Sequence, residues 1–254
     1  MTKTKIKKSL ILAAMVLSAA LLALGQPALA AERVDTDGDG LSDDREVNVY
    51  HTDPKKEDTD GDGLSDTEEL VRGFSPLRKD KVKLSSLDTD QDGLPDSWEI
   101  RLDLDLDNAD QNRNGLPDGQ ELNEGFFPGS KKLQPVDKLI KVNLKKQELA
   151  YYVNDIELDK FKISSGVKSM PTPTGVFAIL DKVPSKNYGG VGWSYPNTKW
   201  NLHFTTKGLR YFIHGAYWHN KFGRPMSHGC VNVSYAAMER LYNFAEVGTR
   251  VEIF

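Results

Sequence analysis

Four copies of a twelve-residue pattern occupy the first half of the chain and restrict its fold more than any other feature. They begin at Asp35, Asp58, Asp88 and Asp110 and read DTDGDGLSDDRE, DTDGDGLSDTEE, DTDQDGLPDSWE and DQNRNGLPDGQE. Each copy has oxygen-bearing side chains at positions 1, 3, 5 and 9, glycine at position 6 and glutamate at position 12. This register is typical of a calcium loop, where the backbone carbonyl of position 7 and both glutamate oxygens complete the coordination. We therefore expect this half to fold around bound calcium ions.

The four loops predict a set of calcium ligands. In chain order these are Asp35, Asp37, Asp39, Leu41, Asp43, Glu46, Asp58, Asp60, Asp62, Leu64, Asp66, Glu69, Asp88, Asp90, Asp92, Leu94, Asp96, Glu99, Asp110, Asn112, Asn114, Leu116, Asp118 and Glu121. The loops are EF-hand-like, but the segments before them are too short and broken for an incoming helix. The fourth loop has two asparagines where the others have aspartate, so we expect it to bind calcium most weakly. An acidic, solvated spacer would explain the composition but not the repeated register.

Charge divides the chain into two halves. Residues 32–125 hold 20 Asp and 8 Glu against 11 Lys and Arg, a net charge of −17, and residues 126–254 have a net charge of +9. The stretch EGFFPGSKKLQPVDK, rich in glycine, proline and lysine, lies at the division. We predict a calcium-binding module at 31–125, a linker at 126–136 and a second domain at 137–254. The basic half suits anionic wall polymers, and we expect no nucleic-acid partner.

Residues 1–30 have the organisation of a secretory signal peptide. Four lysines precede an apolar run from Leu10 to Leu24, and Ala28-Leu29-Ala30 supplies a small-x-small cleavage site. The run is short for a membrane span, which needs roughly 20 residues. We expect cleavage near Ala31, export to the cell wall, periplasm or extracellular space, and no stable membrane span afterwards. An uncleaved anchor is the alternative.

The second half alternates apolar and polar residues at the period of β-strands. The expected strands are 139–146, 148–155, 156–166, 175–180, 208–214, 231–233 and 249–254, and the expected helix is 234–245. A turn is expected at Asn154-Asp155. This pattern predicts a mainly β domain, a β-sandwich or barrel-like fold with one short helix. The stretch 183–201 lacks periodicity and is interpreted as a long binding loop, in which Trp193 and Tyr195 are candidate substrate contacts.

Cys230 is the only cysteine, so an exported chain cannot use it for an internal disulfide. It is either a buried apolar residue or a thiol kept for its reactivity as a thiolate. A nucleophilic thiol needs a base, and the candidates are His214 and His228. His214 ends a predicted strand and can reach the thiol, whereas His228 is too close in sequence for an unstrained contact. Gly229 removes side-chain bulk, so backbone N–H groups can point at an oxyanion.

Three segments of the second half resemble L,D-transpeptidase (YkuD-type) catalytic domains. They are KLIKVNLKKQELAYYVND, MPTPTGVF and IHGAYWHNKFGRPMSHGCVNVS, of which the last contains the family's histidine and its Ser-His-Gly-Cys motif. The first half resembles thrombospondin type 3 calcium repeats. The resemblance implies an L,D-transpeptidase-like β-sandwich over 137–254 that acts on peptidoglycan stem peptides.

The resemblance also implies residue roles. Cys230 would be the nucleophile that forms a thioester, and His214 would be the base, oriented by the backbone carbonyl of Gly215. His228 and Gly229, with the N–H of Cys230, would form the oxyanion hole. Ser227 and Asn232 would hold this loop in shape.

The predicted function is therefore that of an exported cysteine L,D-transpeptidase, an acyltransferase of cell-wall biogenesis that forms 3→3 cross-links or attaches another amine acceptor. Calcium is expected to be structural, and no cofactor is expected for catalysis. Water as acceptor would instead give L,D-carboxypeptidase activity. A catalytically silent, calcium-dependent wall-binding protein is a second alternative. A zinc peptidase using His203, His214, His219 and Cys230 is a third, although the chain lacks an HExxH spacing.

Overall fold

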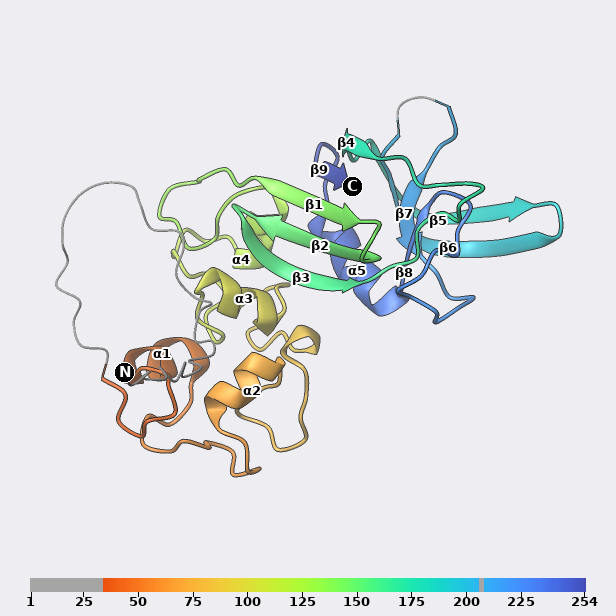
Figure 1. Cartoon of the computed structure of the whole chain (residues 1–254). Coiled ribbons are helices and arrows are strands. Elements are labelled where there is room, and N and C mark those ends of the chain that lie inside the picture. The colour runs from red at the N-terminus through yellow and green to blue at the C-terminus, as the bar shows by residue number, and fades with distance from the viewer. Residues whose placement is uncertain (1–33, 206–207) are drawn as a thin grey trace, which may run out of the picture. The chain divides into compact units, whose positions relative to one another are not determined.

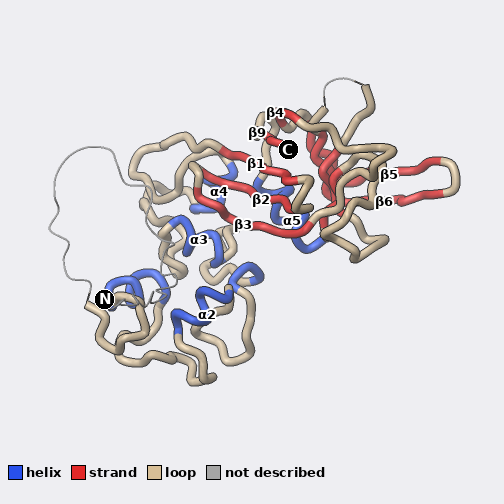
Figure 2. Tube along the Cα trace, viewed as in Figure 1, coloured by secondary structure: helices blue, strands red, loops and turns tan. Residues whose placement is uncertain are grey.

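The computed structural model describes residues 34–205 and 208–254, and the predicted signal peptide at 1–30 lies outside them. Figure 2 shows that helices predominate in the first half and strands in the second. The helical segments are α1 (Asp43–Arg45), η1 (Glu46–Tyr50), α2 (Asp66–Arg72), η2 (Leu84–Ser86), α3 (Asp96–Leu102), α4 (Asp118–Asn123) and α5 (Tyr235–Phe244). The strands are β1 (Lys138–Asn143), β2 (Glu148–Val153), β3 (Ile156–Lys162), β4 (Gly175–Ala178), β5 (Asp181–Gly190), β6 (Trp193–His203), β7 (Phe212–Gly215), β8 (Val231–Val233) and β9 (Arg250–Ile253). Within the described ranges, no helix is both long and apolar enough to cross a bilayer.

Each calcium-type loop leads directly into a helix that begins at position 9 of the repeat. In the second repeat, Ser65 is the N-cap residue and its side chain accepts a hydrogen bond from the Glu68 N–H. The acidic residues of the first turn interact favourably with the positive end of the helix dipole. Gly73 ends α2 in the left-handed conformation, which glycine adopts without steric cost. Each repeat is therefore a loop followed by one short helix; no α-helix leads directly into the loops that begin at Asp58, Asp88 and Asp110, and only the short turn η2 precedes the third.

The repeats associate in pairs. The Asp39 carboxylate of the first loop accepts a hydrogen bond of 3.1 Å from the backbone N–H of Thr67 in the second. In the same way, Asp92 of the third loop accepts one of 3.0 Å from Gly119 in the fourth. A Cβ at Gly119 would lie 2.4 Å from the backbone oxygen of Asp92, so this close approach requires glycine. Position 5 of one loop thus fixes the helix of its partner.

Two β-sheets form the second half, as predicted for a β-sandwich (Figure 1). The first sheet has the order β3-β2-β1-β9-β4 and the second the order β5-β6-β7-β8. The pairs β1–β2, β2–β3, β4–β9, β5–β6 and β6–β7 are antiparallel, whereas β1–β9 and β7–β8 are parallel. Asn154 and Asp155 form the predicted turn between β2 and β3, with φ of 48° and 68°, as a tight hairpin turn requires. The predicted helix appears as α5, and the mainly β class is confirmed.

The interpretation of residues 183–201 as a long loop is wrong. They form most of the β5–β6 hairpin, which extends beyond the other strands in Figure 1. The alternation is obscured because the hairpin has a register shift between Lys186 and Tyr188, and because Asn197 and Trp200 have positive φ. Most of its side chains are exposed or half-buried, so no continuous apolar face marks the strands. The strand expected at 208–214 also begins later, at Phe212.

One apolar core connects the third and fourth repeats with the β-sheets. Trp98 of α3 is almost fully buried, and its ring packs edge-on against Tyr151 of β2 at 5.6 Å and Phe244 of α5 at 6.0 Å. The predicted linker at 126–136 is ordered, because the Phe127 N–H bonds to the Gln134 carbonyl and a β-bridge joins its two ends. The loops and the sheets are therefore joined by packing as well as by the chain.

Candidate active site and calcium loops

The candidate active site is a cavity beside the parallel strands β7 and β8. His214 lies opposite Asn232 in their register, and Cys230 precedes β8 by one residue. Since residues two apart on an extended chain face the same way, Cys230 and Asn232 share a face with His214. The cavity is lined by Tyr188, Trp193, Tyr195, His214, Trp218, Met226, Ser227, His228, Cys230 and Asn232. The structure thus brings together all the predicted side chains of the catalytic site.

His214 is buried and held by a single backbone contact. Its Nδ1 lies 2.9 Å from the carbonyl oxygen of Gly215. A carbonyl only accepts hydrogen bonds, so Nδ1 carries the proton and Nε2 is left as the basic nitrogen. Burial lowers the pKa of His214 to about 4, and the imidazole is neutral at physiological pH. The Tyr188 ring stacks on the imidazole at 4.5 Å, which covers one of its faces.

Cys230 is a free, half-buried thiol. Burial raises its pKa to about 11, although a hydrogen bond from the Phe212 backbone opposes this shift. The resting site therefore contains a neutral thiol and a neutral imidazole. The sequence left open a buried thiol or a reactive thiolate, and the surrounding apolar atoms disfavour a charge on sulfur in the resting site. A thiol in this state would have to lose its proton to act as a nucleophile, and the basic nitrogen of His214 lines the same cavity.

The backbone before Cys230 forms a turn that depends on Gly229. Gly229 has a φ of 114°, and a Cβ there would lie 2.2 Å from the Tyr211 ring. Its N–H donates to Ser227 Oγ at 3.2 Å, and the Ser227 hydroxyl donates to the Cys230 carbonyl. No residue in 34–205 or 208–254 accepts a hydrogen bond from the N–H of His228 or Cys230. These two N–H groups are therefore the donors that remain for an oxyanion.

Aromatic rings form the walls of the cavity. Trp193 stacks on the exposed His228 ring at 4.9 Å, and Tyr195 stacks on Trp218 at 3.9 Å. Trp218 and Met226 were not among the predicted site residues, nor was Tyr188. The sequence around the predicted residues is rich in aromatic side chains, which is the only signal that could have identified them. These side chains line one cavity only after the β5–β6 hairpin and the loop after β7 come together.

The residues of the zinc alternative are not brought together. No group of histidine and cysteine ligands with metal-binding spacing occurs in the described part of the chain. His203 contacts Arg210, whereas His219 Nε2 lies 3.2 Å from the amide nitrogen of Asn232. His219 therefore supports the motif asparagine.

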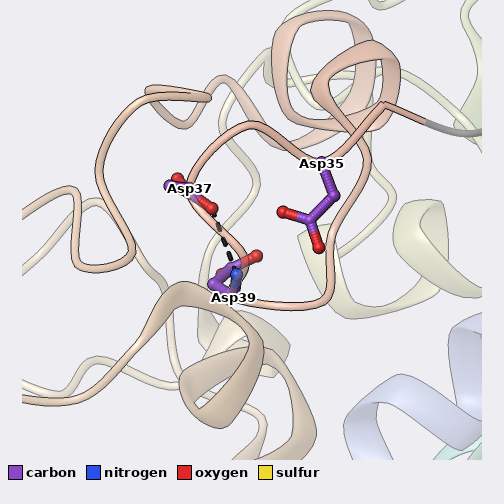
Figure 3. Close-up of side chains that lie close together, drawn as sticks. All are labelled: Asp35, Asp37 and Asp39. Atoms are coloured by element: carbon purple, nitrogen blue, oxygen red, sulfur yellow. Dashed lines mark hydrogen bonds between the residues drawn. The ribbon is translucent and has the colours of Figure 1, made fainter.

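The first three calcium-type loops each gather three carboxylates. In each, the ligand atoms of positions 1, 3 and 5 lie within 4.8 Å of one another. Figure 3 shows this for Asp35, Asp37 and Asp39, with the Asp39 N–H donating to Asp37. Such a grouping of like charges is unfavourable unless a cation balances it.

The glutamates at position 12 complete this arrangement. Glu46, Glu69 and Glu99 are fully buried, and both carboxylate oxygens of Glu69 and Glu99 lack a hydrogen-bond partner among the described residues. Burial, together with the neighbouring aspartates, raises the pKa of Glu69 to about 7 and that of Glu99 to about 10. Unpaired buried carboxylates beside an acidic cluster fit a divalent ion with oxygen ligands, as calcium prefers.

The position-9 aspartates, which were predicted as calcium ligands, make hydrogen bonds within their own loops. The Asp66 carboxylate accepts hydrogen bonds from both the backbone N–H and the hydroxyl of Thr59. Asp43 and Asp96 bind Thr36 and Thr89 in the same way. These aspartates lie outside the three clusters, so their local hydrogen bonds close the loop onto the helix. The carbonyl role of position 7 stays a prediction.

Comparison with known proteins agrees with both halves. Residues 137–253 match the family model of the L,D-transpeptidase catalytic domain (YkuD), and residues 35–57 and 58–73 match that of the bacterial TSP3 repeat. The chain carries a YkuD-family L,D-transpeptidase catalytic domain preceded by TSP3 repeats, and both family predictions are confirmed.

Several known proteins are similar to this chain. The Bacillus subtilis (strain 168) protein YqjB, whose name assigns it to the L,D-transpeptidases, is 27% identical over 128 residues, which cover 47% of this chain and 72% of YqjB. An L,D-transpeptidase structure from Mycobacterium smegmatis is 23% identical with a TM-score of 0.44, over 48% of this chain and 60% of that one. The Enterococcus faecium L,D-transpeptidase C442S mutant is 29% identical with a TM-score of 0.43, over 46% of this chain and 50% of that one. The chain thus spans between half and two thirds of the length of these two structures.

Proposed function

We propose that the protein is an exported cysteine L,D-transpeptidase that acts on peptidoglycan stem peptides through a thioester on Cys230. The observation that carries this proposal is the contact of His214 Nδ1 with the Gly215 carbonyl, 2.9 Å long. It leaves Nε2 as a base in the cavity that contains the Cys230 thiol. This is the arrangement that nucleophilic catalysis by cysteine requires.

The first half-reaction transfers the stem peptide to the enzyme. The Cys230 sulfur attacks the carbonyl of the third stem residue, and the thiol proton passes to His214 Nε2. The N–H groups of His228 and Cys230 hold the developing oxyanion, an interaction whose loss typically costs about 10²–10³ in rate. The carbon–nitrogen bond then breaks, and His214 returns the proton to the amine of the leaving D-alanine. The product is a thioester between the stem peptide and Cys230.

The second half-reaction resolves the thioester. An amine of a second stem attacks the carbonyl carbon while His214 removes a proton, and the carbon–sulfur bond breaks. Cys230 leaves as a thiolate and regains that proton. The result is a 3→3 cross-link. Water as acceptor would make the enzyme an L,D-carboxypeptidase.

In this proposal, calcium stabilises the acidic module and supplies no catalytic chemistry. The buried, unpartnered carboxylates of Glu69 and Glu99 support this role. The net positive charge of the second half suits anionic polymers of the cell wall, where an exported enzyme of this class would meet its substrate.

Mass spectrometry of the purified protein tests the enzymatic proposal. A carbapenem should add covalently to the wild type and not to the Cys230→Ala variant. A disaccharide-tetrapeptide should be converted to a tripeptide–tetrapeptide dimer, with one D-alanine released per cross-link. Conversion only to the tripeptide would establish the carboxypeptidase. An intact protein that neither gains mass nor turns over substrate would contradict both and leave the silent wall-binding protein.

A further inference from the structure

The second and fourth loops have the same backbone structure. In the second, Gly63 has a φ of 97° and its N–H donates to Asp58 at 2.8 Å. In the fourth, Gly115 has a φ of 91° and its N–H donates to Asp110 at 2.8 Å. The N–H of the position-7 leucine also bonds to the position-5 side chain in both loops, at 2.9 Å and 2.8 Å. Any difference between the two loops therefore lies in the side chains at their centres.

The centres of these loops differ in the hydrogen bonds that the buried glutamate at position 12 accepts. In the second loop, Glu69 has no hydrogen-bond partner for either oxygen among the described residues. In the fourth loop, the equally buried Glu121 accepts from Asn112 Nδ2 at 2.7 Å and from Asn114 Nδ2 at 2.6 Å, one bond to each oxygen. The two amides thus bind both oxygens of the carboxylate that a calcium ion would need as a ligand.

The orientation of both amides is fixed by further hydrogen bonds. Asn112 Oδ1 accepts from the Asn114 N–H at 2.9 Å, and Asn112 Nδ2 also donates to the carbonyl of Pro128 at 2.7 Å. Asn114 Oδ1 accepts from the Leu116 N–H at 2.8 Å. If the oxygen and nitrogen of either side-chain amide were exchanged, its NH2 group would face a backbone N–H, which is also a donor. The buried Glu121 carboxylate would then lose the hydrogen bond from that amide. The amide nitrogens therefore face the position where the other loops offer carboxylate oxygens.

We propose that the fourth loop is closed by these hydrogen bonds and holds no calcium, so that the module takes three ions. The inference rests on the proposed calcium function of the other three loops. It goes beyond a weaker fourth site: the asparagines replace the ion, and the loop keeps its structure without one. The fourth repeat, whose helix shares the apolar core with the sheets through Leu122, is then independent of calcium supply.

Counting bound ions in the full mature chain tests this inference. Calcium per protein, measured by native mass spectrometry and by equilibrium dialysis with elemental analysis, should reach three at saturation. The double variant Asn112→Asp/Asn114→Asp restores carboxylates at positions 3 and 5 and should bind four. Its matched counterpart in the second loop, Asp60→Asn/Asp62→Asn, should bind two.

Hydrogen exchange supplies a readout that does not depend on the count. Backbone protection across residues 110–121 should be the same in calcium and in chelator, whereas protection across 58–69 should fall by at least tenfold in chelator. Four ions on the wild type, or a folded Asn112→Asp/Asn114→Asp variant that still binds three, would contradict the proposal that the fourth loop is closed. Neither result would contradict calcium binding by the other three loops. No bound ion on the wild type would instead contradict the calcium proposal itself.

Discussion

The two halves of the molecule are stabilised by opposite means. In the repeats, the fully buried side chains include the carboxylates of Glu46, Glu69 and Glu99, which have unpartnered oxygens. In the catalytic domain, the buried positions are mostly apolar, such as Ile140 and Leu149, and backbone ladders satisfy the polar groups. The acidic half therefore has buried carboxylates that a bound cation would satisfy, whereas the basic half carries its own core. If the proposed calcium sites are occupied, the order of the first three repeats should depend on calcium and that of the sheets should not.

The largest expected effect separates the two halves by chemistry. Replacing Cys230 with alanine removes the nucleophile, and turnover of the stem tetrapeptide should fall by at least about 10⁴-fold. Calcium stoichiometry and the melting temperature should stay those of the wild type, because the thiol has no part in the repeats. A variant that kept more than about a tenth of the wild-type turnover would exclude the thioester pathway.

Chelation should produce the largest structural contrast between the halves. In EDTA, the carboxylate clusters of the first three loops lose their compensating charge, and amide protection over residues 35–99 should fall by at least tenfold. Protection in β1, β2 and β9 should change less than threefold. Hydrogen-exchange mass spectrometry with and without calcium gives both numbers in one experiment. Equal loss in both regions would show that the basic half also depends on calcium.

The turn at Gly229, which precedes Cys230, offers a test of the proposed oxyanion contacts within the catalytic half. Gly229→Ala should reduce kcat by about 10²–10³-fold, because the new Cβ meets the Tyr211 ring and displaces the N–H groups of the turn. Gly223 also has a positive φ of 99°, but a Cβ there meets only the Lys162 side chain, at 3.9 Å. Gly223→Ala is therefore the matched control for backbone strain, and its kcat should stay within about threefold of the wild type.

The packing of Trp98 should link the stabilities of the two halves. Trp98→Ala leaves a cavity between α3, β2 and α5, and should cost about 3–5 kcal/mol of unfolding free energy. Trp98→Phe keeps most of the ring contacts and should cost less than half as much. Thermal unfolding should show the loss in the catalytic domain as well as in the repeats. If only the repeats were destabilised, the shared core would contribute nothing to the sheets.

The smallest effect is expected from pH within the physiological range. The folded pKa of His214 lies below its ordinary value, at about 4, and that of Cys230 lies above it, at about 11. The neutral pair therefore persists between these values, and the acylation rate should vary less than threefold from pH 6 to pH 9. It should decline as pH falls towards 4, where His214 gains a proton and can no longer accept one. A rate that rose steadily through pH 8 would indicate that a resting thiolate is required.

Much of the catalytic fold could be predicted because its strands are locally encoded. Residues 140–145 alternate between apolar and polar, within the strand predicted at 139–146, and the structure contains β1 at Lys138–Asn143. The Asn154-Asp155 turn was likewise predictable, since these residue types tolerate positive φ. The β5–β6 hairpin was not, because its strands pair with each other across a bulge and bury no continuous face. Backbone pairing between the two strands, rather than an alternating apolar face, makes that segment extended.

The sequence by itself determined the local chemistry of this protein. The spacing of acids around glycine defined the loops, and the order of His214, His228 and Cys230 along the chain defined the candidate catalytic residues. Short-range geometry is enough for both, since turns and motif loops are built from neighbouring residues.

Only the tertiary structure decided which groups meet and in what charge state. It placed His214 beside Cys230 through the parallel β7–β8 pairing, and burial left both of them neutral. It also paired Glu121 with two amides while Glu69, at the same position of its loop, has no partner. Charge and hydrogen bonding depend on burial and on partners distant in sequence, and these are fixed only when the chain has folded.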